Sequence, residues 1–242
     1  MKHSELYVQI NVLSNLYSQS IENPLGVANK VLYKDIQVRR ILDDFFSKTE
    51  IGKNYFISSE ASGRPCIQIE GAASKFFSGD FNISHSNGSL AVFVCFGSST
   101  SPISVGCDIE CIIPRISRLD IATEYFYPQE IQWIFTDHGD ERFERFYRIW
   151  TAKEALLKFW GKSIFGISAT PIFSPIPQDK NSCLNFHQFF LQSPAREVYV
   201  LTVVAPFSVS EDSLFLEDGW CLRSSAQIYA AESPMSTVSP KI

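Results

Sequence analysis

The sequence of 242 residues lacks any long hydrophobic run. Its longest, Leu90–Phe96, is far shorter than the roughly 20 apolar residues that a membrane-spanning helix needs. The N-terminal segment Met1–Glu5 has a single lysine and no apolar stretch behind it, so we expect no secretory signal peptide. These absences predict a cytosolic protein without a membrane partner.

Two further features are missing. The six cysteines include no C-x-x-C pair and have no histidine at zinc-finger spacing, so we expect reduced and mostly buried thiols. An excess of basic residues is also missing, because 21 Lys+Arg stand against 26 Asp+Glu and the net charge is −5. General nucleic-acid binding requires a basic face to neutralise phosphates and is therefore not expected. The charge still permits a local basic pocket for a small anionic ligand.

What is present is a globular composition, 45% hydrophobic and 14% aromatic, which excludes disorder as the main state. Apolar periodicity predicts helices at Val27–Phe46, Ser117–Tyr125, Pro128–Phe135 and Glu141–Trp160. Strands are predicted at Cys66–Glu70, Phe81–Ser84, Leu90–Phe96, Ile103–Ile113, Asn185–Leu191 and Glu197–Ala205.

The order of these elements predicts the fold class. Asn87-Gly88 indicates a hairpin between the second and third predicted strands, and we expect the fourth strand to join them in one antiparallel sheet. Strands and helices do not alternate as βαβ units, so the fold class is α+β. The stretch 165–181 is rich in Pro and Ser and is expected to be a loop. The residues from about 230 onward indicate a loose tail.

Two acidic residues alternate in the strand that contains Gly106. Asp108 and Glu110 are two positions apart, so their side chains point to one face, about 6.6–7 Å apart along the chain. Carboxylates this close repel each other, and both stay ionised only where a cation lies between them. A hard divalent ion fits this requirement. The alternative is an exposed strand edge whose acidic residues face solvent.

The long predicted helix carries a second candidate group. Trp150, Glu154 and Lys158 are four residues apart and therefore share one helical face. A Glu–Lys pair at this spacing is common on exposed helices, which is the simpler interpretation. Because the bulky Trp150 lies on the same face, Glu154 is also a candidate metal ligand and Lys158 a candidate cation for phosphate.

A third candidate lies at a predicted strand end. His85 stands between two serines and before the Asn87-Gly88 turn, where it can donate hydrogen bonds to a phosphate. A single histidine in a turn is more often an ordinary surface or core residue, so this position alone does not decide.

Taken together and in this order, the motifs resemble the 4'-phosphopantetheinyl transferase superfamily, in particular its surfactin-synthetase-activating (Sfp-like) type. The resemblance extends from about Ser62 to Gly161, with weaker agreement in the strand at 197–205. It rests on four motifs: Gly63-Arg64-Pro65, Phe81–Ser86, Gly106–Glu110 and Trp150–Lys158.

The resemblance implies a fold and a reaction. The fold would consist of two similar α+β halves related by pseudo-twofold symmetry, roughly residues 1–114 and 115–242, in a monomer with coenzyme A between the halves. The reaction would transfer the 4'-phosphopantetheine arm of coenzyme A to a serine of an apo acyl or peptidyl carrier protein and release adenosine 3',5'-bisphosphate.

The resemblance also implies catalytic roles. Asp108, Glu110 and Glu154 would hold Mg²⁺, with Mn²⁺ as the other candidate ion. Lys158 would neutralise the departing bisphosphate. Glu130 occupies the place of a general base in this type, and a metal-bound water is the competing base.

The resemblance further implies that coenzyme A would be bound by basic and polar residues. His85 would contact its 3'-phosphate together with Ser84, and Lys158 would reach its pyrophosphate. Arg64 stands where the family usually has the lysine of Gly-Lys-Pro. Lys34 is the candidate from the basic cluster of the first helix, which also contains Lys30, Arg39 and Arg40.

Two other functions remain open on the sequence. A metal-dependent phosphoesterase also uses an Asp-x-Glu pair with a distant Glu, but it leaves His85, Arg64 and Lys158 without a joint explanation. A non-enzymatic module that binds coenzyme A or a carrier protein would not need the intact acidic residues.

Overall fold

A computed structural model describes residues 6–14, 26–60, 63–75, 77–98, 102–136, 139–172 and 184–229. Its elements confirm the α+β class. The helices are α1 (Gly26–Ser47), α2 (Ile116–Tyr125), α3 (Pro128–Ile134) and α4 (Glu141–Phe159), with short 3-10 helices η1 (Gly71–Lys75), η2 (Ile164–Ala169) and η3 (Glu211–Ser213). The strands are β1 (Leu6–Leu13), β2 (Tyr55–Ser59), β3 (Pro65–Ile69), β4 (Phe77–Ser86), β5 (Ser89–Ser98), β6 (Gly106–Cys111), β7 (Asn185–Gln192), β8 (Val198–Ala205), β9 (Leu214–Leu216) and β10 (Cys221–Tyr229).

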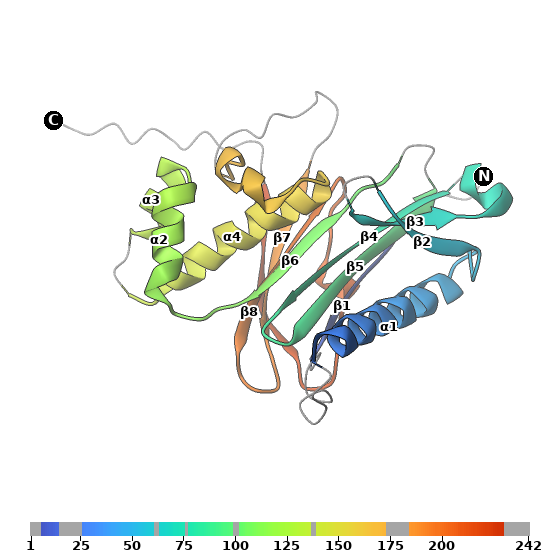
Figure 1. Ribbon diagram of the computed structural model, residues 1–242, viewed down its shortest axis with the longest axis horizontal. Coiled ribbons are helices and arrows are strands. Elements are labelled where there is room, and N and C mark those ends of the chain that lie inside the picture. The colour runs from blue at the N-terminus through green and yellow to red at the C-terminus, as the bar shows by residue number, and fades with distance from the viewer. Residues whose placement is uncertain are drawn as a thin grey trace.

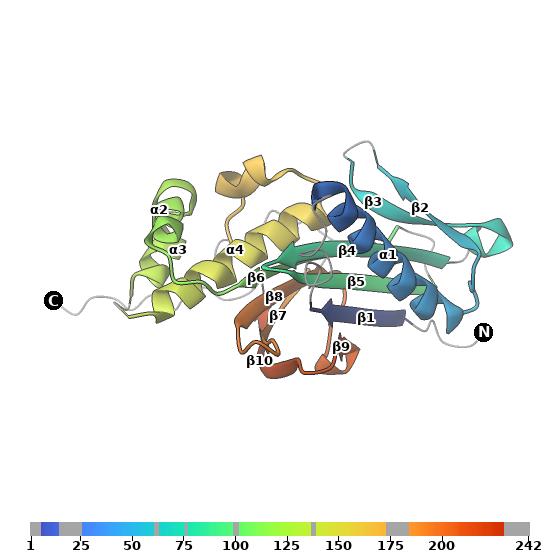
Figure 2. The same ribbon diagram turned by 60° about the horizontal axis from the view of Figure 1, so that its bottom comes forward.

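Two four-stranded sheets form the centre of the molecule. Their strand orders are β4-β5-β1-β9 and β10-β7-β8-β6, while β2 and β3 form a separate hairpin. Helix α1 lies across the first sheet and α4 across the second (Figure 1), and the view in Figure 2 shows both helices on the outside of the sheets. The layers are therefore helix, sheet, sheet and helix.

Strand β5 explains this layering, because it is buried on both faces. One set of its side chains packs with α1, namely Leu90, Val92, Val94 and Phe96. The alternate set packs against the second sheet, namely Ala91, Phe93 and Cys95. Successive strand residues point to opposite faces, so an unbroken apolar run is what a strand between two layers requires. At about 25 cal/mol per Å² of buried apolar surface, this shared core dominates the stability.

The edge along which β4 lies beside β6 is polar, and this arrangement differs from the predicted pairing. We expected β6 to join β4 and β5 in one sheet, and this was wrong: β6 pairs with β8 instead. The other edge of β6 lies beside β4, whose side chains bind its backbone. The amides of Val105 and Cys107 donate to Asp80 and Asn82, and the amide of Cys111 donates to the hydroxyl of Ser86.

Most predicted elements are present within one to four residues of their expected ends, and Asn87-Gly88 forms the expected hairpin with positive φ at both residues. The strands β1, β2, β9 and β10 were not predicted. Residues Ile164–Ala169 form the 3-10 helix η2, where the expected loop at 165–181 begins, and residues 173–181 of that stretch lie outside the described residues. Tail residues from 230 and Cys183 lie outside the described residues.

The expected division of the chain into two halves near residue 114 stays a prediction. Strands from one side of this position pair with strands from the other side. Strand β6 precedes this position yet belongs to the sheet of β7 and β8. Strand β9 lies near the other end of the chain yet pairs with β1 in parallel. Over the ranges given above, no helix has both the length and the apolarity needed to cross a membrane.

Gly106 allows α4 to approach β6 closely. A Cβ atom built at this position would lie 2.0 Å from the carbonyl oxygen of Ala155 and 2.7 Å from the amide nitrogen of Phe159. Both are backbone atoms, so the helix itself would have to move. The glycine of the Gly-Cys-Asp-Ile-Glu motif therefore sets the distance between the strand and the helix that carry the candidate site.

Replacing Gly106 with alanine is expected to lower the free energy of unfolding by about 3 kcal/mol, because such overpacking of a core forces backbone shifts. Urea denaturation measures this change. Gly139→Ala is the matched control, since an added Cβ there meets only the flexible end of Glu141. Equal stability of the two variants would show that the close approach is not required.

Candidate active site

Three carboxylates meet where β6 and α4 pack together. Asp108 and Glu110 come from the strand and Glu154 comes from the helix, and one oxygen of each lies within 4.8 Å of the others. The strand periodicity explains the first pair, because Cys107 and Ile109 point into the core between the sheets. The expected alternative of a solvent-exposed acidic edge does not hold for Asp108, which is buried.

The electrostatics of this acidic cluster fit a cation. Burial, together with the negative charges of Asp108 and Glu110, raises the pKa of Glu154 to about 8. Burial also raises the pKa of Glu110. Among the described residues, the buried Oδ2 atom of Asp108 has no hydrogen-bond partner. Oxygen ligands that repel one another and an unpartnered carboxylate oxygen are what a hard divalent ion binds, so the residues fit a metal such as Mg²⁺.

Lys158 lies at the side of this acidic cluster. Its Nζ is 2.7 Å from Oδ1 of Asp108 and 3.9 Å from Oε2 of Glu154. Burial by itself lowers the pKa of Lys158, but the negative charges of Asp108, Cys107 and Glu154 and the hydrogen bond to Asp108 together outweigh it, and the pKa rises above its ordinary value. The ammonium therefore keeps its charge beside the carboxylates, as electrostatic stabilisation of phosphate requires.

Ser84, His85 and Lys34 converge on the same region. The hydroxyl of Ser84 donates to Oδ1 of Asp108 at 2.7 Å, so in this structure it orients a carboxylate. His85 is exposed, and its pKa is lowered by burial of part of the ring and by the charges of Lys34 and Lys158. Their predicted contact with coenzyme A stays a prediction. The side chain of Lys30 lies outside the described residues.

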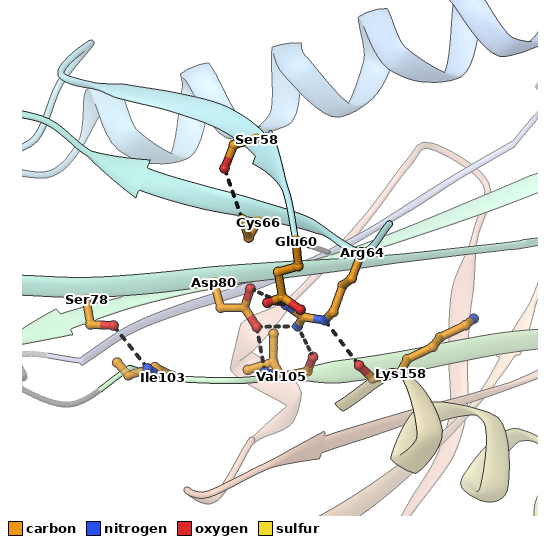
Figure 3. Close-up of polar contacts among 9 residues, drawn as sticks. All are labelled: Ser58, Glu60, Arg64, Cys66, Ser78, Asp80, Ile103, Val105 and Lys158. Atoms are coloured by element: carbon orange, nitrogen blue, oxygen red, sulfur yellow. Dashed lines mark hydrogen bonds and ion pairs between the residues drawn. The ribbon is translucent and has the colours of Figure 1, made fainter. Parts of the chain in front are cut away.

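Arg64 is placed differently from the expected phosphate ligand. Its guanidinium pairs with Asp80 and also donates to Glu60 and to the carbonyls of Val105 and Lys158 (Figure 3). The arginine side chain is only 10% exposed. From the sequence we expected the charge of Arg64 to bind coenzyme A, because nothing in the local sequence identifies Asp80 as its partner.

Glu130 is also placed differently from the expected base. Its side chain is fully buried and pairs with Lys153, with 2.9 Å between Oε2 and Nζ. Its oxygens accept the amides of Tyr127 and Ile172 as well. A general base has to reach the proton that it removes, and these contacts hold the carboxylate in the core. The catalytic role of Glu130 stays a prediction that this burial does not favour.

Sequence reasoning also missed the polar face of β4. Asp80, Asn82, Ser84 and Ser86 alternate with apolar residues, and all four bind groups of β6 or its preceding segment. Such alternation is the signal of a strand with one polar face. The pattern was visible, but only the structure reveals that this face is directed toward another strand and not toward solvent.

Replacing Glu154 with glutamine is expected to stabilise the metal-free protein at high pH. The pKa of Glu154 is about 8 in the folded state against an ordinary value of 4.5, so folding stability is lost as pH rises between these values. Glutamine does not titrate, and its advantage in Tm grows from about pH 5 to about pH 9, reaching about 3 °C or more. Thermal unfolding in EDTA measures this.

Added Mg²⁺ is expected to reverse the order of the two proteins in the same assay, because the variant lacks one of the three carboxylates that would hold the ion. An advantage of glutamine that does not change with pH would contradict the prediction, since it would show that Glu154 does not titrate in this range.

Comparisons with known proteins agree with this geometry. Residues 104–204 match the 4'-phosphopantetheinyl transferase superfamily, a segment that contains β6, α4 and all three carboxylates. The chain is 38% identical over 87 residues to "4'-phosphopantetheinyl transferase AcpT" of Escherichia coli K12, covering 36% of this chain and 42% of that protein.

Two further relatives match a longer part of the chain. It is 31% identical over 137 residues to "4'-phosphopantetheinyl transferase ffp" of Bacillus subtilis, covering 57% of this chain and 54% of that protein. It is 31% identical over 151 residues to "L-aminoadipate-semialdehyde dehydrogenase-phosphopantetheinyl transferase" of Schizosaccharomyces pombe, covering 59% of this chain and 56% of that protein. The chain thus spans about half the length of the curated relatives it matches. The match to the 4'-phosphopantetheinyl transferase superfamily thus covers residues 104–204, the segment that carries the acidic residues of the candidate site.

Proposed function

We propose that this protein is a 4'-phosphopantetheinyl transferase that uses coenzyme A and modifies a serine of an apo carrier protein. The observation that supports this most is the acidic cluster of Asp108, Glu110 and Glu154 with Lys158 beside it, inside the segment that matches the family. The relatives named above carry this activity in their names.

In the proposed reaction, the serine oxygen forms a bond to the phosphorus that bears the pantetheine arm. The bond from that phosphorus to the bridging pyrophosphate oxygen breaks, and adenosine 3',5'-bisphosphate leaves with this oxygen. The serine proton passes to a base. Phosphoryl transfer depends mainly on positioning and charge neutralisation, which are what this site offers.

The residues divide these tasks. Asp108, Glu110 and Glu154 would hold a divalent cation, Mg²⁺ or Mn²⁺, which neutralises pyrophosphate charge when bound. Lys158 stabilises the charge that develops on the departing bisphosphate, and Asp108 fixes the position of its ammonium. A pocket of about 380 Å³ beside Lys158, which is also lined by Gly63, Arg64, Asn82 and Lys162, is the proposed place for part of coenzyme A.

Intact-mass spectrometry tests this function directly. Apo acyl and peptidyl carrier proteins are incubated with the protein, coenzyme A and Mg²⁺, beside a sample containing EDTA. We expect the mass of one phosphopantetheine arm to be added to the carrier, and not in EDTA. Hydrolysis of coenzyme A without addition to any carrier would favour a phosphoesterase. Coenzyme A binding without reaction on any carrier would favour a binding module.

A further inference from the structure

We propose that Arg64 is a positioning residue, which fixes the last turn of α4 and thereby sets Lys158 against Asp108, and that it is not a phosphate ligand. This inference rests on the proposed function and concerns how its site is held. It reverses the expectation that the charge of Arg64 serves coenzyme A.

The hydrogen-bond donors of Arg64 are all used within the protein. An arginine has five N–H groups, and each of those of Arg64 has an acceptor within the protein. Nε donates to the carbonyl of Lys158 at 3.1 Å. One terminal nitrogen donates to Asp80 at 3.1 Å and to Glu60 at 3.4 Å, and the other donates to Asp80 and to the carbonyl of Val105. A phosphate would have to displace one of these partners.

The ion pair of Arg64 and Asp80 is buried. The side chains of Arg64 and Asp80 are 10% and 4% exposed. A buried ion pair is costly to break, because either charge would be left without compensation. The bidentate geometry uses the planar fork of arginine, which a lysine cannot reproduce.

The pair of Arg64 and Asp80 binds the backbone of the two elements that carry the candidate site. Asp80 accepts the amide of Val105 at 2.8 Å and Arg64 donates to its carbonyl at 2.9 Å, so the segment just before β6 is held by its amide and its carbonyl. From the same guanidinium, Nε reaches the carbonyl of Lys158 in the last turn of α4 (Figure 3). This carbonyl belongs to the end of the helix, where it also accepts the amide of Gly161 at 3.1 Å and where the helix dipole favours a cation.

Lys158 is therefore fixed at two points. Its carbonyl is bound by Arg64 and its ammonium by Asp108. The clamp of Arg64 and Asp80 thus joins the hairpin of β2 and β3 and strand β4 to the strand and helix that carry the acidic cluster. Loss of the clamp releases the backbone of Lys158 while leaving its side chain chemistry intact.

The test compares Arg64→Lys, Asp80→Asn and the double variant in carrier modification, using coenzyme A and 3'-dephospho-coenzyme A. We expect each single variant to lower kcat by roughly 10- to 100-fold, because small misplacements of a reacting group have such effects. The KM for coenzyme A is expected to change less than about threefold, since ground-state binding is not lost. The double variant is expected to be no slower than either single variant, because both remove one unit.

The two substrates separate this role from phosphate binding. A positioning residue leaves the preference of the enzyme for coenzyme A over the dephosphorylated form unchanged. A rise in KM for coenzyme A alone, with kcat and the rate on 3'-dephospho-coenzyme A preserved, would overturn the proposal and identify Arg64 as a ligand of the 3'-phosphate.

Hydrogen exchange supplies a readout that does not depend on activity. The amides of Trp160 and Gly161 close the last turn of α4, and we expect them to exchange faster in Arg64→Lys than in wild type. Arg148→Lys is the matched control, because Arg148 is a half-buried arginine of α4 that binds Gln188 away from the clamp. Unchanged exchange in Arg64→Lys would overturn the clamp, whereas a wild-type protein without transfer would overturn only the proposed function.

Discussion

Phosphopantetheine transfer is expected to fall by roughly 10²- to 10⁴-fold when Asp108 is replaced by asparagine, a loss typical of removing one group that stabilises transition-state charge. The replacement removes a proposed metal ligand and the ion partner of Lys158 at once. The expected change lies in kcat more than in KM, because both contacts act on charge that develops during transfer. Steady-state rates on one carrier protein measure it.

One further variant and one control distinguish the loss of a metal ligand from the loss of the ion pair with Lys158. Glu110→Gln leaves the pair of Asp108 and Lys158 intact, so a comparable loss in this variant points to the cation. Asp120→Asn removes an exposed carboxylate of α2 and serves as the control for a change of net charge. In Asp108→Asn and Glu110→Gln, the rise of Tm with Mg²⁺ should disappear along with activity. Full activity of Asp108→Asn would exclude the acidic cluster as the reaction centre.

The second large effect concerns stability. Replacing Glu130 with glutamine leaves the ammonium of Lys153 without a counter-ion in the core, where both side chains are fully buried. We expect the free energy of unfolding to fall by about 3–5 kcal/mol, as when one partner of a buried pair is removed. Burial lowers the pKa of Lys153 although Glu130 opposes this effect, and without Glu130 the ammonium keeps, among the described residues, only the carbonyls of Ile167 and Thr170 as hydrogen-bond acceptors. Urea denaturation measures the loss.

The double variant Glu130→Gln with Lys153→Met is expected to recover most of this stability, because no unpaired charge remains buried. Lys48→Gln, which breaks an exposed pair with Asp44, should change stability by less than about 1 kcal/mol. The same double variant tests the expected general base. Transfer within about tenfold of wild type would make Glu130 structural, whereas a loss of 10²-fold or more in a stable protein would restore its catalytic role.

Regular elements were predictable where local chemistry decides them. The apolar stripe of α4, its Gly161 end and the Asn87-Gly88 hairpin depend on residues that lie close together in the chain. The strands β9 and β10 were not predicted, because they are short or polar and become strands only by pairing with β1 and β7.

The acidic cluster was predictable for a similar reason. Asp108 and Glu110 share a face through strand periodicity, and Glu154 and Lys158 share one through helix periodicity. What the sequence could not provide was the distance between the two elements, which Gly106 sets by allowing backbone contact with α4. The family motifs identified these four residues as site candidates, and the structure shows that they lie together.

The α+β class, the acidic residues of the site and the lysine beside them could be predicted from the sequence, because periodicity and short motifs are local properties. Which charges are free to act depends on tertiary packing. It directed Arg64 to Asp80 and Glu130 to Lys153, across sequence separations of 16 and 23 residues. A buried charge takes the partner that the packing of other elements provides, and no local pattern contains that information.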